Sequence, residues 1–400
     1  MIADLHSHYP MHLVPPAQAD ALRLIRSPRA RGRLLDRVRA VLIGIASQFA
    51  NYESFESGPR VTVPLLRAGD VRVVLSVLHS PFDEFDLGLP YGAPPASGYL
   101  DTVLRQLEAV ERDIARNFPG QAIVARDPSQ LEAGQAQGRI VLVHCVEGGF
   151  HLGGNPREVE RGVGELARRG VAYITLAHLI WRSVATSANA IPFLPSPLYR
   201  ALFPQPRVGL TELGQAAVRA MVRHGVLVDV THMSRRALAD TFAVLDELDP
   251  DRKVPVIASH GAYRFGSDRY NLSASTVERI AARGGVIGLL LAEHQTADGL
   301  RWRRTGSLQE SLQVVFRHLD RVREITGSHR HAAIGSDLDG FIKPTLAGLE
   351  DASRLGALPR ALAQRYGESD AGLISSGNVL RLLRSHWRAD PTPAGERNVI

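Results

Sequence analysis

The sequence predicts a (β/α)8 TIM barrel with insertions, and three observations support this fold class. Eight short apolar runs rich in β-branched residues recur along the chain. Each run is followed by a polar or glycine-containing turn and then by a segment with the periodicity of a helix. The length of 400 residues is one that this fold often reaches when it carries insertions. A doubly wound open sheet built from the same alternating elements is the alternative.

The predicted strands share a short, nearly continuous apolar sequence, which is typical of strands buried on both faces. They span residues 1–8, 71–80, 139–149, 171–179, 225–234, 254–261, 285–294 and 331–340. Helices are predicted between them. Thr211 stands as an N-cap before apolar residues at helical spacing, and a later helix closes on Gly284 and Gly285.

One domain is expected to span residues 1–400, because no linker rich in Pro, Ser or Gly divides the chain and no repeat is visible. Three longer segments are interpreted as insertions on this domain. They lie at about residues 9–70, 81–138 and 187–208.

The composition excludes several classes of protein. With 44% hydrophobic and 22% charged residues, the chain is expected to be globular rather than disordered. The net charge of +6 comes from scattered arginines, so no nucleic-acid partner is expected. The single cysteine, Cys145, excludes an intrachain disulfide framework and favours a reducing cytosol. Neither a secretory leader nor an apolar run long enough for a membrane span is evident, so we expect a cytoplasmic location.

Polar residues recur at the carboxyl ends of the predicted strands. His6 and His8 are two residues apart, so on a strand both imidazoles point to the same side. The ends of five further strands carry Glu147, His178, His232, His260 and Asp337. In a barrel these ends converge on one mouth, where catalytic groups are found. His144 has the opposite parity to Glu147 and is expected to face the helices.

These residue types indicate a metal site. Neutral imidazoles and a carboxylate are ligands suited to Zn²⁺, and the lack of a cysteine cluster excludes a thiolate site. The set is large enough for two ions about 3.5 to 4 Å apart, with a carboxylate that bridges them. Water held between two such ions becomes a hydroxide nucleophile at neutral pH, so the sequence predicts metal-assisted hydrolysis.

A family resemblance is carried by motifs that occur in a fixed order. They read "CVEGG", "GLTELG", "VLVDVTHMS", "PVIASHGAYR", "NLSASTVERIAARGGVIGL" and "IGSDLDG". This set resembles the renal (membrane) dipeptidase family, peptidase family M19, of the metal-dependent amidohydrolase superfamily. The resemblance is patchy before residue 139 and fairly continuous from there to about residue 383. It implies a (β/α)8 barrel of the metallo-dependent hydrolase type with two Zn²⁺ ions.

The resemblance also implies roles for individual residues. His6 and His8 match the first metal-binding pair of the family, and Glu147 matches the carboxylate that bridges both ions. His232 and His260 match the ligands of the second ion.

Two further residues match the groups that act on the substrate. His178 matches the histidine that binds the substrate's carbonyl region and stabilises the oxyanion. Asp337 matches the residue that takes the proton from water and passes it to the leaving amine. For Asp339, two residues further on, we expect a structural role.

The chain departs from the family pattern at two positions. His8 stands where the family usually has aspartate, which makes the metal centre one unit more positive. Tyr270 stands where the dipeptidases place an arginine that grips the substrate's terminal carboxylate. Arg269 and Arg264 are the candidates to replace that arginine in substrate binding.

The sequence therefore predicts a zinc-dependent hydrolase that cleaves the amide bond of a dipeptide or similar small substrate. Two alternatives stay open. The first is an amidohydrolase that acts on a different amide or on a lactone, which His8 and Tyr270 favour. The second is a metal-binding barrel without catalysis. The family resemblance also implies a homodimer.

Overall fold

Eight parallel strands close into a barrel in the computed structural model, which confirms the predicted fold class. The structure describes residues 1–13, 37–39, 58–86, 89–191, 194–301, 304–340 and 345–387. The barrel strands are β1 (Ile2–Ser7), β2 (Val71–Leu78), β4 (Ile140–Glu147), β5 (Tyr173–Thr175), β6 (Leu227–Asp229), β7 (Val256–Gly261), β8 (Val286–Leu289) and β9 (Ala332–Ile334). They pair in that order, and β9 pairs with β1 to close the ring.

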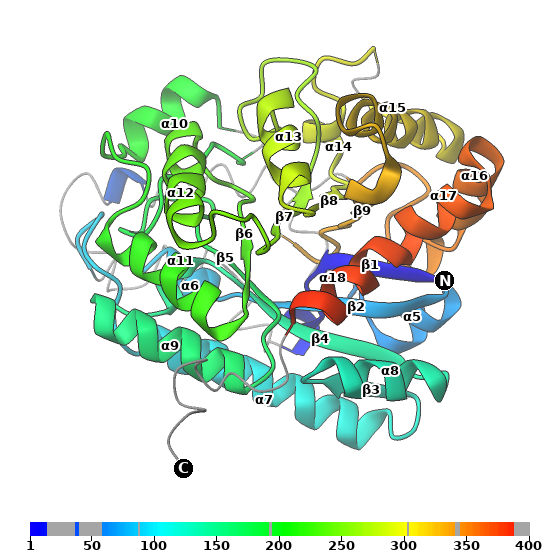
Figure 1. The fold of residues 1–400 in the computed structure, drawn as a ribbon, viewed down its shortest axis with the longest axis horizontal. Helices are drawn as coiled ribbons and strands as arrows, with labels where there is room; N and C mark the ends of the chain where they lie inside the picture. The colour runs from blue at the N-terminus through cyan, green and yellow to red at the C-terminus, as the bar shows by residue number, and fades with distance from the viewer. Residues whose placement is uncertain are drawn as a thin grey trace.

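Helices surround these strands (Figure 1). The longer ones are α7 (Tyr99–Asn117), α8 (Pro128–Ala136), α9 (Pro156–Arg168), α11 (Glu212–His224), α12 (Arg235–Leu248), α13 (Ala274–Ala282), α15 (Leu308–Thr326), α16 (Ala357–Tyr366) and α18 (Asn378–His386). The shorter ones are α5 (Val63–Ala68), α6 (Pro81–Glu84), α10 (Ser196–Leu202), α14 (Glu293–Thr296) and α17 (Glu368–Gly372). None of the helices in the described part of the chain is both long and apolar enough to cross a membrane. The predicted N-cap is present, since Thr211 accepts a hydrogen bond from the backbone of Gly214.

A ninth strand, β3 (Ala122–Ala125), was not expected from the sequence. It lies within the segment 81–138 that we predicted to be an insertion, and it pairs in parallel with β4, starting opposite Ile140. Its four residues are too short a run to stand out as a strand. Most of the predicted insertion 9–70 lies outside the described residues, as do residues 192–193 of the segment 187–208.

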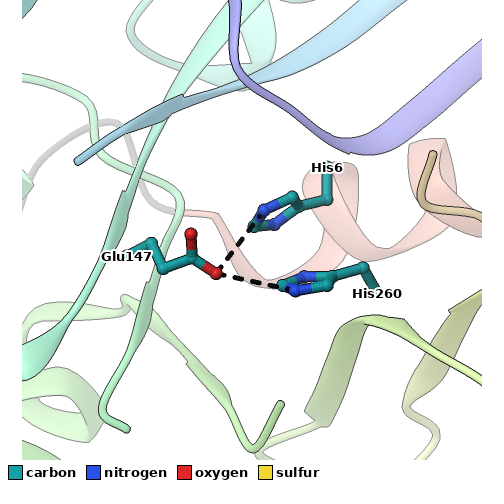
Figure 2. A group of neighbouring side chains, drawn as sticks. All are labelled: His6, Glu147 and His260. Atoms are coloured by element: carbon teal, nitrogen blue, oxygen red, sulfur yellow. Dashed lines mark ion pairs between the residues drawn. The ribbon is translucent and has the colours of Figure 1, made fainter. Parts of the chain in front are cut away.

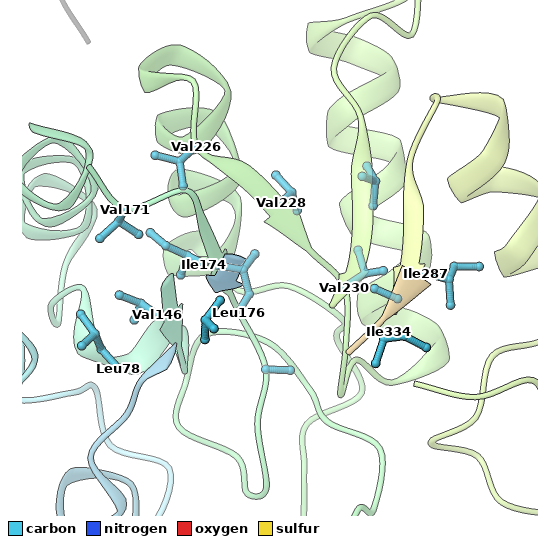
Figure 3. Packing of buried hydrophobic residues seen from close by; sticks show 14 of the residues in the cluster. Leu78, Val146, Val171, Ile174, Leu176, Val226, Val228, Val230, Ile287 and Ile334 are labelled. Atoms are coloured by element: carbon cyan, nitrogen blue, oxygen red, sulfur yellow. The ribbon is translucent and has the colours of Figure 1, made fainter. Parts of the chain in front are cut away.

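Successive side chains of each strand point to opposite faces, which divides the core into a layer inside the barrel and a layer between the strands and the helices. In β4, Val141, Val143 and Cys145 share the inner face with Glu147 and pack with residues of the other barrel strands. Leu142 and Val146 point outward into the layer between strands and helices, which Figure 3 shows in part. Residues of α18 belong to the inner cluster. The side chain of Asn378 donates to the carbonyl of Ala332, the first residue of β9, so α18 lies at the amino ends of the strands.

His144 lies on the outer face of β4, as its parity predicts. It is fully buried, and neither ring nitrogen has a hydrogen-bond partner among the described residues. Burial lowers the pKa of His144 from 6.5 to about 3. The folded protein therefore keeps this ring neutral at acidic pH values where the unfolded chain protonates it.

Replacing His144 with leucine should make the protein more resistant to acid. The contribution of the neutral ring to stability is complete above pH 6.5 and is lost as the pH falls toward 3. We expect the wild type to lose roughly 3 kcal/mol more than His144→Leu between about pH 7.5 and 4.5. Urea unfolding of both proteins at the two pH values measures this difference. A change in packing affects the variant equally at both pH values and therefore drops out of the comparison. Equal losses in the two proteins would contradict the prediction.

Candidate metal centre

Seven polar residues meet at the carboxyl ends of the barrel strands, as the sequence predicts. They are His6, His8, Glu147, His178, His232, His260 and Asp337, and none is more than 7% exposed. His6, Glu147 and His260 belong to β1, β4 and β7 themselves. His178, His232 and Asp337 each stand three residues after the end of β5, β6 and β9. The barrel thus brings residues from the whole length of the chain to one buried point.

Glu147 is the centre of the cluster (Figure 2). Its Oε1 atom lies 3.6 Å from Nε2 of His6, 3.5 Å from Nε2 of His232 and 3.6 Å from Nε2 of His260. Its Oε2 atom lies 3.5 Å from Nε2 of His8 and 3.3 Å from Nε2 of His178. The two oxygens therefore face two different groups of imidazoles.

The chain turns sharply directly after Glu147. Gly148 has φ +100°, and a Cβ atom there would lie 2.3 Å from the ring of Phe150. Only glycine fits this turn without strain, which explains the first glycine of the "CVEGG" motif. The turn ends β4 at the residue whose carboxylate enters the cluster.

The imidazoles themselves approach one another closely. Nε2 of His6 lies 3.2 Å from Nε2 of His8, and Nε2 of His232 lies 3.0 Å from Nε2 of His260. Nε2 of His8 is also 3.1 Å from Oδ1 of Asp337. Three sets of donor atoms are close enough to share an ion: His6 with Glu147 and His260, His6 with His8 and Asp337, and His79 with Glu147 and His178.

A network behind the cluster fixes the protonation of two of these rings. The Ser259 hydroxyl donates to Oδ2 of Asp229 at 2.6 Å, and the Tyr173 hydroxyl donates to the carbonyl of Leu5. Their hydrogens are thus used, and the two oxygens can only accept from the ring nitrogens beside them. Those nitrogens are Nδ1 of His6, 2.8 Å from Tyr173 and 3.1 Å from Ser259, and Nδ1 of His260, 3.0 Å from Ser259.

With Nδ1 as the donor, a neutral ring presents the lone pair of Nε2 to the cluster. Burial lowers the pKa of His6 and of His260 well below the usual value, and that of His232 to about 4. These rings are therefore neutral. The Nε2 lone pairs of His6 and His260 face the cluster, whereas Nδ1 of His232 has no hydrogen-bond partner among the described residues.

These features fit a divalent cation. Burial raises the pKa of Glu147 well above its usual value, and its Oε1 atom has no hydrogen-bond donor among the described residues. Ligands about 2.0 to 2.1 Å from a tetrahedral zinc ion stand about 3.3 Å apart. The observed separations of 3.0 to 3.6 Å agree with that value. A cation would satisfy the lone pairs and the carboxylate together.

His8 differs from the other rings. Burial acts to lower the pKa of His8, but the hydrogen bond to Asp337 and the charge of Glu147 outweigh burial and raise it above its usual value. The contact between His8 and Asp337 joins the end of β1 to the loop after β9. Backbone hydrogen bonds hold the same junction, because the amide of Asp337 donates to the carbonyl of His6.

Asp339 has the structural position that we expected. Both of its carboxylate oxygens accept hydrogen bonds from the backbone amides of Arg60 and Val61, at 2.9 to 3.1 Å. Asp339 therefore anchors the chain before α5 to the loop after β9, whereas Asp337 points to His8. The two aspartates of the "SDLDG" motif thus divide into one in the cluster and one that supports it.

The predicted substrate-binding residues are placed differently from the cluster ligands. Tyr270 is buried; its hydroxyl donates to the carbonyl of His260 at 3.0 Å, and its ring packs edge-on against His232. Arg264 donates to the carbonyls of Asp268 and Asn271. Arg269 is exposed. Tyr270 therefore supports two cluster histidines, and Arg264 supports its own loop.

Sequence reasoning missed several residues that hold the cluster. Asp229 and Ser259 lie inside quoted motifs, where a polar residue within a buried strand was the available signal. Glu84 of α6, which contacts His178, lies in a segment that carried no signal because we interpreted it as an insertion.

A ring of imidazoles around one carboxylate, at the mouth of a (β/α)8 barrel, is an arrangement typical of metal-dependent hydrolases. Comparison with known proteins narrows this class. The model of the family "Membrane dipeptidase (Peptidase family M19)" matches residues 31–392, and the chain belongs to this family. His6 and His8 precede the matched range, so their place in the site depends on the geometry described above.

Individual relatives agree with this family. An uncharacterized dipeptidase of Schizosaccharomyces pombe is 28% identical over 294 residues, which are 72% of this chain and 63% of the relative. The match covers less than two thirds of the length of such curated relatives.

Solved structures share the fold of this chain. A dipeptidase AC of family M19 superimposes with a TM-score of 0.67 at 20% identity, covering 96% of this chain and 98% of the other. A metallopeptidase from Rhodobacter sphaeroides, liganded with a phosphinate mimic of the dipeptide L-Ala-D-Ala, gives 0.66 at 19% identity, covering 96% and 99%.

Proposed function

We propose that this protein hydrolyses the amide bond of a dipeptide or similar small substrate with the help of two divalent cations, of which zinc suits the donor set best. One structural observation gives the proposal its main support. Oε1 of Glu147 lies 3.5 to 3.6 Å from the proposed ligands His6, His232 and His260. Oε2 lies 3.5 Å from the proposed ligand His8 and 3.3 Å from His178, which we assign to the substrate. A carboxylate so placed is suited to bridge two ions.

In this proposal His6, His8, Glu147, His232 and His260 hold the ions. Bound ions would polarise the substrate carbonyl and make water a stronger acid. Ser259 and Tyr173 keep Nδ1 of His6 protonated, so that Nε2 stays available as a ligand.

Two residues act on the substrate in the proposed reaction. Asp337, whose Oδ1 lies 3.1 Å from Nε2 of His8, takes the proton from the attacking water and delivers it to the leaving amine. His178 faces the cluster through Nε2, 3.3 Å from Glu147. With a proton on Nε2 in addition to the one on Nδ1 that binds Glu84, the ring donates to the substrate carbonyl and stabilises the charge that develops on its oxygen.

The test combines metal analysis with a panel of substrates. Protein purified without chelator is analysed for metal content per chain, and release of free amino acids from L,L and L,D dipeptides is followed with ninhydrin. The L,D peptides belong in the panel because the Rhodobacter sphaeroides relative was liganded with a mimic of L-Ala-D-Ala. We expect two zinc ions per chain and cleavage of dipeptides. A chain that binds no metal would rule out the proposal.

The position of Tyr270 favours a second candidate, an amidohydrolase that acts on another amide or on a lactone. Tyr270 carries no positive charge, and Arg264 donates through Nε and one terminal nitrogen to the backbone carbonyls of its own loop. Comparing a dipeptide with its C-terminal amide separates the two candidates. If an arginine grips the carboxylate, amidation lowers kcat/KM by about tenfold or more. Equal rates for the two compounds would favour the second candidate.

A further inference from the structure

We propose that Glu84 is a positioning residue that sets the orientation of His178 for catalysis. This inference rests on the hydrolysis proposed above. Glu84 is the last residue of the short helix α6 and is fully buried. A glutamate without solvent contact needs partners that compensate its desolvation. Its two hydrogen-bond partners belong to the loop that carries His178, and Nε2 of His79 lies 3.5 Å from its Oε2.

Both oxygens of Glu84 bind that loop. Oε2 accepts a hydrogen bond from Nδ1 of His178 at 2.6 Å, and Oε1 accepts from the backbone amide of Ile180 at 3.0 Å. The first distance is short, as in hydrogen bonds to a charged acceptor. The carboxylate therefore fixes the ring and the backbone two residues beyond it as one unit.

The chain before Glu84 is itself held in place. Ser80 caps α6 by accepting from the amide of Asp83, and Pro81 fixes the first helical residue. Next to this cap, Nδ1 of His79 lies 3.0 Å from the carbonyl of Glu147. A carbonyl can only accept, so His79 donates and ties the start of α6 to the end of β4. Glu84 thus connects His178 to the strand that carries the central carboxylate.

The bond to Glu84 determines which nitrogen of the His178 ring faces the site. Because Nδ1 donates to Glu84, Nε2 is the nitrogen that faces the site, 3.3 Å from Oε2 of Glu147. The rings of His79 and His232 lie edge-on against His178, with centroids 4.5 and 4.6 Å away. Rotation of the ring would present a carbon atom to the substrate instead of Nε2. Glu84 prevents this rotation by fixing the opposite side of the ring.

Replacing Glu84 with glutamine tests the proposal with little change of volume. Glutamine has one acceptor oxygen and cannot accept from both His178 and Ile180. We expect kcat to fall about 10- to 100-fold, KM to change less than about threefold, and metal content to stay the same. A loss of metal in parallel with activity would overturn the proposal, because Glu84 would then support the metal centre itself.

A double-mutant cycle shows whether the effect passes through His178. In a His178→Ala background, Glu84→Gln should cause no further loss of kcat. A full additional loss in that background would contradict the proposed role. Glu293→Gln is the matched control, since Glu293 is also a buried glutamate in a short helix after a barrel strand, and it binds Thr305 instead of a cluster histidine. It should leave kcat unchanged.

A spectroscopic measurement separates this proposal from the proposed function. In protein labelled with ¹⁵N-histidine, the signals of His178 are assigned by comparison with His178→Ala. The wild type should show a protonated Nδ1, and Glu84→Gln should shift that signal toward a mixture of tautomers. An unchanged spectrum would refute the role of Glu84 even if dipeptides are cleaved. If no dipeptide is cleaved but the shift occurs, the positioning role stands and the substrate was chosen wrongly.

Discussion

Glu147→Gln should lose its metal and, in the metal-free form, unfold at a higher temperature than the wild type. In the metal-free wild type the carboxylate is buried and its Oε1 has no hydrogen-bond donor among the described residues. A buried acceptor without a donor is costly. The amide group of glutamine carries no charge and can donate to the Nε2 lone pairs of the surrounding histidines. We expect the metal-free variant to gain about 1 to 3 kcal/mol.

The same substitution should abolish function. A neutral amide binds cations far more weakly than a carboxylate does. It also has only one oxygen, so it cannot offer an oxygen ligand to each of two ions. We expect kcat/KM to fall by more than the roughly 100-fold that is typical of changes outside the ligand shell. Thermal unfolding with and without added zinc, together with metal analysis, measures both effects. The wild type should gain about 4 kcal/mol at a zinc concentration a thousandfold above Kd, and the variant much less.

The control for this experiment is again Glu293→Gln, which removes a buried carboxylate that binds Thr305. It should keep the metal content and the zinc-dependent stabilisation of the wild type. If Glu147→Gln retained the full metal content, Glu147 would not be the central ligand. The arrangement of two imidazole groups around its two oxygens would then need another explanation.

The cluster could be predicted from the sequence because its residues occupy regular positions. Strand ends in a barrel converge on one mouth, so a polar residue at each end is informative without knowledge of any contact. Parity places His6 and His8 on one side of β1 and separates Glu147 from His144, and the structure confirms both placements. These inferences need only the period of two along a strand.

The residues that support the cluster could not be predicted in the same way. Glu84 and His178 are 94 residues apart, and nothing in the local pattern around Glu84 indicates which loop it meets. The hydroxyl directions of Ser259 and Tyr173, which fix the histidine tautomers, depend on acceptors from other strands. Such contacts arise only when the barrel is closed.

The backbone conformation of two cluster residues could not be predicted from the sequence either. His232 and Asp337 have left-handed conformations, with φ of 65° and 57°, which are uncommon for residues other than glycine. No glycine stands close to His232, and the glycines near Asp337, Gly335 and Gly340, do not indicate that residue 337 itself is left-handed. Both residues stand three positions after a short strand, and the left-handed conformation turns their side chains back to the cluster. Strain of this kind is often found at functional sites.

Asp337→Asn should keep the metal and lose turnover. Asparagine tolerates the left-handed conformation that residue 337 adopts, so the loop after β9 should keep its shape. The amide cannot take the proton from water or return it to the leaving amine, and loss of this type of group costs about 10²- to 10⁴-fold in rate. Metal content and kcat measured on the same preparation test the prediction. A protein that only binds metal would show no such change.

Asp339→Asn provides the matched control, because Asp339 is also left-handed, with φ 61°, and lies two residues away. Its carboxylate binds the amides of Arg60 and Val61, so the substitution should reduce stability by about 1 to 2 kcal/mol and leave kcat nearly unchanged. If Asp337→Asn lost metal and activity together, Asp337 would be a ligand, as its grouping with His6 and His8 permits. Retention of metal without turnover would instead assign it to proton transfer, because its carboxylate would be needed for the reaction but not for binding the ions.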